Sequence, residues 1–177
     1  VHDFVEDKQG FIWLGTQRGI DRFDGHQFTQ VIKGEAPSGL PGSSVYALEL
    51  DPKSGLIWTA TIGGLALFDP ISFQVTHIPL IDHGGYRHQS ARSLFFDATG
   101  QLWVGTENSL FVYNADTSRF IPAPGFSARL KNINHITQDA SGLYWLATGD
   151  GLYIYDTESV TAVLASEIST ELNSLLY

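Results

Sequence analysis

Large apolar residues recur along this chain in short alternating stretches that are separated by Asp and Gly. A Trp marks each stretch, at spacings of 45, 45 and 42 residues, in a four-residue motif that ends in Thr. The four motifs begin at Trp13, Trp58, Trp103 and Trp145. A repeat of this length, rich in β-forming residues, is typical of a β-propeller with one four-stranded blade per repeat.

Each repeat predicts four strands, A to D. Strand A ends near an Asp that is followed by a Gly, and this segment predicts a tight turn, because Asp bonds its own backbone and Gly accepts positive φ. The four Asp are Asp7, Asp51, Asp97 and Asp139. Strand B carries the Trp, and a two-residue turn leads to strand C. We expect strand D to contain Phe28, Phe73, Phe120 and, in the fourth repeat, Val160.

The Trp side chains are expected to lie between blades as core residues, since large aromatics dominate the buried area of such folds. Small residues lie two positions after each Trp: Gly15 and Gly105, with Ala60 and Ala147 in the other two repeats. They are expected to keep strand B thin where the next blade approaches. The chain is thus predicted to be a single all-β segment, with blades over roughly 1–42, 43–87, 88–131 and 132–172 and a further blade starting at 173–177.

Both ends of the chain offer a strand A, which favours an open arc of a seven- or eight-bladed propeller over a closed ring. The chain contains no Met, so we expect it to be a piece of a longer protein. With a net charge of −9 it is not expected to bind nucleic acid, and no cofactor is indicated. There is no Cys, and His77, His83 and His88 with Asp82 lack a fixed metal-ligand spacing, so we expect no metal site.

Candidate binding residues gather on one predicted face, where the irregular D-to-A connections and the B-to-C turns emerge. Variation confined to one face of a repetitive scaffold is how such folds carry specificity. At the entry of the inner strands, around the mouth of the central channel, we expect His2, Tyr46, Arg92, Asn134 and His135, and in the B-to-C turns Arg18, Glu107, Asn108 and Asp150. The alternative is that these side chains only hydrate the channel and satisfy the strand ends.

One stretch carries a family resemblance. It runs from Val5 to Thr16 (VEDKQGFIWLGT) and continues at Gly19–Gly25 (GIDRFDG). It closely resembles the two-component regulator propeller repeat, and the same motif returns in all four repeats. The resemblance implies a periplasmic sensor region of an inner-membrane protein, placed before a cytoplasmic histidine kinase or GGDEF diguanylate cyclase. In the family, ligands are often oligosaccharides.

These observations together predict a non-catalytic, extracytoplasmic ligand-sensing domain that works with the remainder of its parent sensor. Its ligand would be a small molecule or an oligosaccharide. One alternative is a protein-interaction or homodimerisation scaffold, because an open arc leaves strand edges bare. The other is a propeller lyase, for which His2 and His135 are the candidate catalytic residues.

Overall fold

The computed structural model describes residues 1–31, 39–82, 84–88, 90–114, 116–124, 126, 130–159 and 161–164. Within these residues the chain forms strands and no helix. Four antiparallel four-stranded sheets, each in sequential order, are the blades of the propeller. Blade 1 is β1 (Asp3–Glu6), β2 (Ile12–Thr16), β3 (Gly19–Phe23) and β4 (Phe28–Val31), and blade 2 is β5 (Val45–Leu50), β6 (Ile57–Thr61), β7 (Gly64–Phe68) and β8 (Val75–Ile78). Blade 3 is β11 (Ala91–Phe96), β12 (Leu102–Thr106), β13 (Leu110–Asn114) and β14 (Arg119–Pro122), and blade 4 is β15 (His135–Gln138), β16 (Tyr144–Thr148), β17 (Gly151–Asp156) and β18 (Thr161–Leu164).

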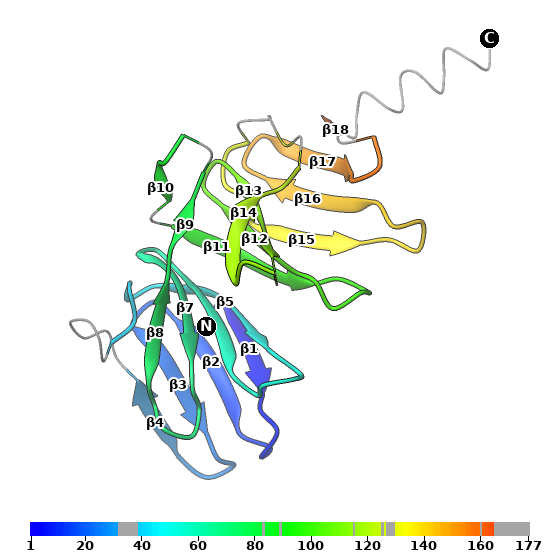
Figure 1. The fold of residues 1–177 in the computed structure, drawn as a ribbon. Coiled ribbons are helices and arrows are strands. Elements are labelled where there is room, and N and C mark those ends of the chain that lie inside the picture. The colour runs from blue at the N-terminus through cyan, green and yellow to red at the C-terminus, as the bar shows by residue number, and fades with distance from the viewer. Residues whose placement is uncertain are drawn as a thin grey trace.

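The blades follow one another in an arc, with strand A of each blade next to strand A of its neighbours (Figure 1). The inner strands are therefore β1, β5, β11 and β15 in chain order. Between blades 2 and 3 the connection carries a small hairpin of β9 (Leu80–Ile81) and β10 (Arg87–His88), and β9 lies beside β14. The predicted all-β propeller architecture with open sheets is confirmed.

The Asp at the end of strand A organises each A-to-B turn. In blade 1 its Oδ1 accepts the backbone N–H groups of Gln9 and Phe11, and its Oδ2 accepts the indole N–H of Trp13 at 2.8 Å. Gly10 takes a φ of 85°, which explains the Gly of the motif. The same Asp-to-Trp bond recurs at Asp97 and Trp103 (2.8 Å) and at Asp139 and Trp145 (2.7 Å).

Blade 2 departs from this pattern. Its turn has one more residue between the Asp and the Trp, and the second carboxylate oxygen of Asp51 accepts the hydroxyl of Ser54 instead of an indole. The extra residue therefore changes the bonding of the Asp but keeps the turn.

Small residues in strand B allow the close approach of the next blade. A Cβ on Gly15 would lie 2.8 Å from Cγ1 of Val45, and a Cβ on Gly105 would lie 2.7 Å from Cγ2 of Ile133. Both distances are too short for carbon atoms, so a larger residue at either position would force the neighbouring side chains to move.

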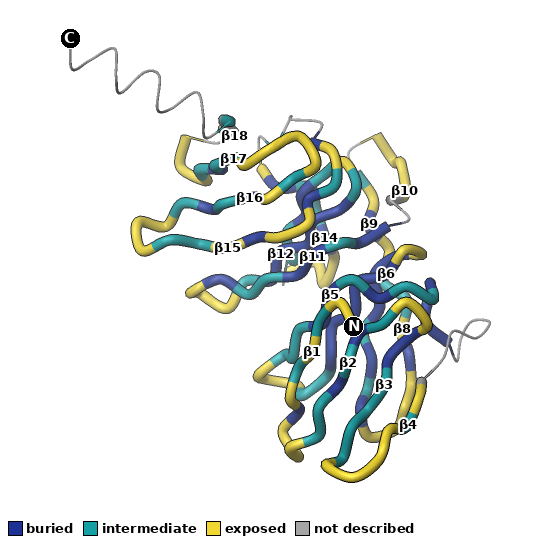
Figure 2. Tube along the Cα trace, turned by 180° about the vertical axis from the view of Figure 1, so that it is seen from behind, coloured by how far each residue is buried: buried dark blue, intermediate teal, exposed yellow. Residues whose placement is uncertain are grey.

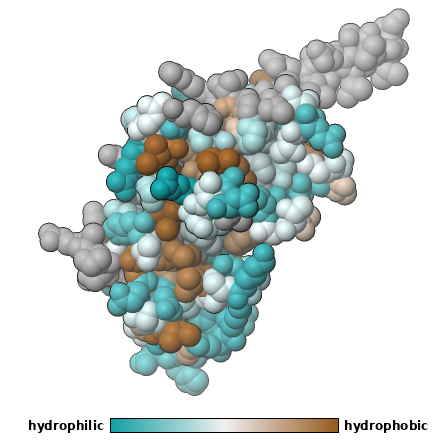
Figure 3. Space-filling model, in the orientation of Figure 1, coloured by the Kyte–Doolittle hydropathy of each residue, from teal (hydrophilic) through white to brown (hydrophobic). Residues whose placement is uncertain are grey.

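The core consists of three apolar clusters, each at a junction between consecutive blades. Every residue of β6 and β12 is buried, whereas β2 and β16 alternate with partly exposed positions. Figure 2 shows this difference between the dark central strands and the lighter outer blades. Some apolar side chains also reach the surface, and Figure 3 shows them between polar ones on one face of the molecule.

One strand prediction was wrong. Phe73 does not lie in strand D of blade 2 but in the turn before it, with a φ of 60°. This turn is longer than its counterpart in blade 1, and Phe73 N–H donates to Asp69 O across it. The Phe73 ring packs instead at 6.1 Å from the Trp13 ring, at the junction of blades 1 and 2. Phe28 and Phe120 lie in strand D as predicted.

Val160 and the predicted start of a further blade at 173–177 lie outside the described residues. In the part of the chain that the structure describes, no helix has the length and apolar character needed to cross a bilayer.

Candidate functional site

The D-to-A connections and the B-to-C turns emerge on the same face of the arc. The Asn132 N–H donates to Glu107 O at 2.7 Å and the Ile62 N–H to Ser44 O at 3.0 Å, each joining a connection to a B-to-C turn. At blade 4 the Lys131 ammonium lies 3.1 Å from an Asp150 carboxylate oxygen. This face, which we call the mouth face, is opposite the Asp-Gly turns.

β-bulges stand at the entry of the inner strands on the mouth face. Val45 and Ala47 pair with consecutive residues of β6, so Tyr46 has no partner in the β5–β6 register. Arg92 is left out of the β11–β12 register in the same way. A bulge turns one side chain away from the ladder, and bulges are frequent at barrel rims and next to active sites.

The bulged residues form a cluster with His2. The His2 and Tyr46 rings meet edge to face with centroids 6.0 Å apart. The Arg92 guanidinium carbon lies 5.1 Å from the centroid of the Tyr46 ring, within the range of a cation–π contact. The Nε of Arg92 is buried and has no hydrogen-bond partner in the structure described above. We call these three residues the mouth cluster.

The structure does not bring the other candidate residues into this cluster. Asn134 is exposed before β15, and its N–H donates to Ala147 O. His135 lies one residue further, paired with Ala147 and exposed. Arg18 and Asn108 are exposed turn residues, Glu107 is partly buried, and the Asp150 carboxylate is engaged by Lys131.

Sequence reasoning missed the bonds that join the inner strands. Asp3 Oδ2 accepts the Leu48 N–H of β5 at 2.8 Å, and the Ser93 hydroxyl donates to Ile133 O at 2.8 Å. These two positions correspond in the repeat, and each directly follows a residue of the mouth cluster. The recurrence of a polar residue at this position was the signal available in the sequence.

Glu49 lies on β5 near Asp3. Burial, and then the negative charge of Asp3, raise the pKa of its carboxyl to about 7. The Glu49 carboxyl is therefore partly protonated at neutral pH.

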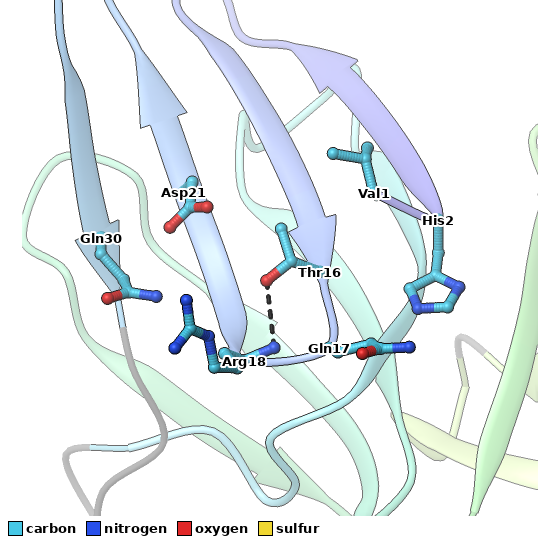
Figure 4. A pocket seen from close by; sticks show the side chains of 7 residues that line it. All are labelled: Val1, His2, Thr16, Gln17, Arg18, Asp21 and Gln30. Atoms are coloured by element: carbon cyan, nitrogen blue, oxygen red, sulfur yellow. Dashed lines mark hydrogen bonds between the residues drawn. The ribbon is translucent and has the colours of Figure 1, made fainter.

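A cavity of about 440 Å³ opens on the mouth end of blade 1. Figure 4 shows its lining, in which Asp21 and Gln30 project from neighbouring strands and the Thr16 hydroxyl accepts the Arg18 N–H. His2 also lines this cavity, so the cavity and the mouth cluster share one residue.

The same position on blade 2 is filled by the connection from blade 1. His77, which corresponds to Gln30, donates from Nε2 to Gly39 O at 2.8 Å, and Leu40 is buried in the junction. Gly63 corresponds to Arg18, and a Cβ there would lie 2.0 Å from Pro41 O. Leu80 and Leu130 are buried in the same way at the next two junctions. The cavity on blade 1 is therefore the counterpart of a blade-to-blade contact.

The mouth cluster offers an aromatic face and a cation. The described residues hold no group of three metal-ligating side chains. On the opposite face, the carboxylate of Asp97 accepts hydrogen bonds from Trp103, Tyr144 and backbone donors of the turn, which fits a structural role.

The comparisons with known proteins agree with this fold. The family model of the two component regulator propeller matches residues 1–18 and 85–108, which confirms the repeat type in blades 1 and 3. Two solved extracellular domains of hybrid two component systems from B. thetaiotaomicron resemble the chain. One is 22% identical with a TM-score of 0.76, and the other is 21% identical with a TM-score of 0.79. In each case 93% of this chain is covered, against 24% of the solved chain.

Virginiamycin B lyase from Staphylococcus aureus is also similar in fold, with 12% identity and a TM-score of 0.62 over 92% of this chain and 54% of the lyase. No curated protein matches the chain significantly. At these identities the likeness shows the propeller fold, and the chain spans about a quarter of the length of the two ectodomains.

Proposed function

We propose that this chain, which carries two component regulator propeller repeats in blades 1 and 3, is a non-catalytic ligand-binding part of a sensor. The sensor would be a membrane-bound signal-transduction protein, with a histidine kinase or a diguanylate cyclase as its output and this segment outside the cytoplasm. The observation that carries the proposal is the mouth cluster, in which Tyr46 and Arg92 stand on bulges and contact each other outside the repeated contacts of the fold.

The chemistry of the cluster favours a ligand with both an apolar ring face and polar groups. A Tyr ring offers a flat apolar surface with a polar end, and a guanidinium donates several hydrogen bonds in a fixed geometry. Arg92 Nε is buried without a partner in the described structure, so a movement of the side chain that brings it to an acceptor on the ligand would complete its hydrogen bonding. A small molecule or an oligosaccharide fits this description.

The position of the mouth cluster also supports a role in signalling. His2, Tyr46 and Arg92 come from three consecutive blades, so one ligand would contact the entries of β1, β5 and β11 together. A ligand that binds one arrangement of these blades better than another shifts the population toward it. The similarity in fold to extracellular domains of hybrid two component systems supports this proposal, including the location outside the cytoplasm.

The test is a thermal-shift screen of the chain against neutral oligosaccharides, anionic oligosaccharides and amino acids. We expect one class to raise the melting temperature, and Tyr46→Ala and Arg92→Ala to abolish this shift while leaving the unliganded melting temperature within a few degrees. Arg119→Ala is the matched control, because Arg119 is an exposed residue of β14. A shift that survives in both cluster variants would refute the site.

A lyase is the second candidate function, because a solved lyase shares the fold. It would use His2 or His135 as the proton-transferring group. If the ligand found in the screen is turned over, and the double variant His2→Ala/His135→Ala abolishes turnover without abolishing binding, the chain is an enzyme. Binding without turnover supports the sensor.

A further inference from the structure

Blade 2 differs from the other blades in the bonding of its Trp. In blades 1, 3 and 4 the Trp indole donates to the carboxylate of the turn Asp, at 2.7–2.8 Å. In blade 2 one more residue separates Asp51 from Trp58, and Oδ2 of Asp51 accepts the Ser54 hydroxyl at 2.7 Å. Among the described residues, the indole N–H of Trp58 therefore has no hydrogen-bond partner.

This N–H can be reached from outside the protein. Trp58 is 7% exposed, and the buried side-chain atoms that lack a partner in the described part of the chain do not include its Nε1. Trp58 lines a cavity of about 310 Å³ between the A-to-B turns of blades 2 and 3. All four strands of both blades are described, so the cavity belongs to an internal junction of the arc.

The next junction along the arc provides a comparison. A hollow of about 620 Å³ lies there between the turns of blades 3 and 4. The Trp103 indole and the Tyr144 hydroxyl, which both line this hollow, donate to the same oxygen of Asp97. At the junction of blades 2 and 3, Leu102 holds the position of Tyr144 and brings no hydroxyl. The unbonded indole N–H of Trp58 thus distinguishes the cavity between blades 2 and 3.

The side chains around Trp58 suit a carboxylate. An indole N–H can only donate, and in the three bonded repeats its partner is a carboxylate oxygen. Lys53 is exposed and lines the cavity, so it brings a positive charge. The Asp51 carboxylate on the same wall already accepts the Lys53 N–H and the Ser54 hydroxyl, which stabilise its charge. Tyr113, whose ring lies 6.0 Å from the Trp58 ring, adds an apolar surface.

We infer that the cavity between blades 2 and 3 binds a small organic carboxylate. One carboxylate oxygen accepts the Trp58 indole N–H and takes the place that the turn Asp has in the other three blades. The apolar part of the ligand lies against Tyr113, and Lys53 balances the charge. This site is on the face opposite the mouth cluster, so it is separate from the site of the proposed function.

The test follows the four indole N–H signals by heteronuclear NMR of the isotope-labelled chain. Phenylacetate, a carboxylate with an aromatic body, is titrated from about 0.1 to 20 mM, because a ligand of this size binds weakly. We expect a saturable shift of the Trp58 signal and no shift of the Trp13 and Trp103 signals. Phenylacetamide, the neutral matched probe, should bind at least about tenfold more weakly, because it offers no charged acceptor.

Two variants of blade 2 test the geometry. Trp58→Phe keeps a ring and removes the N–H, and it also identifies the Trp58 signal by its loss. Phenylacetate shifts of the Lys53 and Gln101 backbone amides should weaken at least about tenfold in this variant. Deletion of Ser54 gives the turn the spacing of the other three blades, so Asp51 should accept the Trp58 N–H and exclude the probe. Near-ultraviolet circular dichroism checks the folding of both variants, and Trp58→Phe decides if the deletion does not fold.

Arg92→Ala is the matched control, because it removes a cation from the mouth cluster and leaves the turn face unchanged. The response to phenylacetate should stay the same in this variant, and its loss would place the probe at the mouth cluster and overturn the inference. A Trp58 signal that does not move over the whole range would overturn it as well. Equal binding of phenylacetamide, or binding that survives unchanged in Trp58→Phe, would do the same.

Discussion

The two ends of the inner strands differ in how much of their bonding is repeated. At the turn end, the Asp of blades 1, 3 and 4 makes the same set of bonds to the turn and to the Trp indole. At the mouth end, the side chains differ in every blade, and the contact between Tyr46 and Arg92 has no repeated counterpart. At the inner strands, therefore, the turn end repeats its side-chain bonding, whereas the side chains at the mouth end vary from blade to blade.

This division has a physical basis. The turn carboxylate accepts hydrogen bonds from N–H and O–H groups that water does not reach. Its removal therefore leaves several of these donors unpaired. The bulge residues lie outside the ladder, so a change there removes side-chain contacts but no strand pairing. Specificity can therefore change at the mouth end at little cost in stability.

The largest expected effect is that of Asp97→Ala. Asp97 is buried and accepts the Trp103 indole N–H and the Tyr144 hydroxyl, at 2.8 and 2.7 Å. Its removal would leave both donors unpaired in the core, and we expect a loss of about 3 kcal/mol in the free energy of unfolding. Urea denaturation at pH 7 measures this loss.

Asp51→Ala is the matched control, because Asp51 bonds turn donors but no Trp. We expect it to cost about 1 kcal/mol. Burial raises the pKa of the Asp97 carboxyl, but the hydrogen bonds from Thr99, Trp103 and Tyr144 outweigh burial and hold this pKa at about 2. The contribution of the ionised Asp97 to stability is thus present above pH 3.8 and is lost as the pH falls toward 2. The difference in free energy of unfolding between wild type and Asp97→Ala should therefore shrink at low pH. Equal losses for the two variants would contradict the comparison.

The second prediction shows that the mouth end also has fixed positions. In Gly105→Ala the new Cβ would lie 2.3 Å from Ser93 Oγ and 2.7 Å from Ile133 Cγ2. We expect destabilisation of about 1–3 kcal/mol from overpacking, again measured by urea denaturation.

The repeat itself suggests the control for this variant. Blade 2 has Ala60 at the position of Gly105, and Ala91 of blade 3 stands where blade 4 has Ile133, so a larger residue on one side goes with a smaller one on the other. The double variant Gly105→Ala/Ile133→Ala should lose less stability than the sum of its single changes. Additive losses would show that the two residues do not share this space.

Much of the fold could be predicted from the sequence because the same pattern of residues occurs in all four repeats. The strands, the turn glycines and the thin strand B follow from residue types whose backbone or size requirements are local. The Phe73 prediction failed because a longer turn moves an aromatic residue without changing the composition of the segment. The contact of Tyr46 with Arg92 and the inner-strand bond of Asp3 depend on which blades are neighbours and on a bulge, and neither leaves a mark in one repeat.

The smallest expected effect concerns Glu49, a carboxylate on the inner strand that no described turn donor serves. Burial, and then the charge of Asp3, raise the pKa of Glu49 to about 7 from an ordinary value near 4.5. Between these values the native protein binds more protons than the unfolded chain, so its stability falls as the pH rises. Glu49→Gln stays neutral and avoids this loss. We expect the variant and wild type to be equally stable at pH 4, and the variant to be about 1 kcal/mol more stable at pH 8, after allowance for the partial exposure of the side chain. Parallel stability curves from pH 4 to 8 would show that Glu49 is as well solvated as a surface carboxylate, and the contrast with Asp97 would then rest on hydrogen bonds to Asp97 alone.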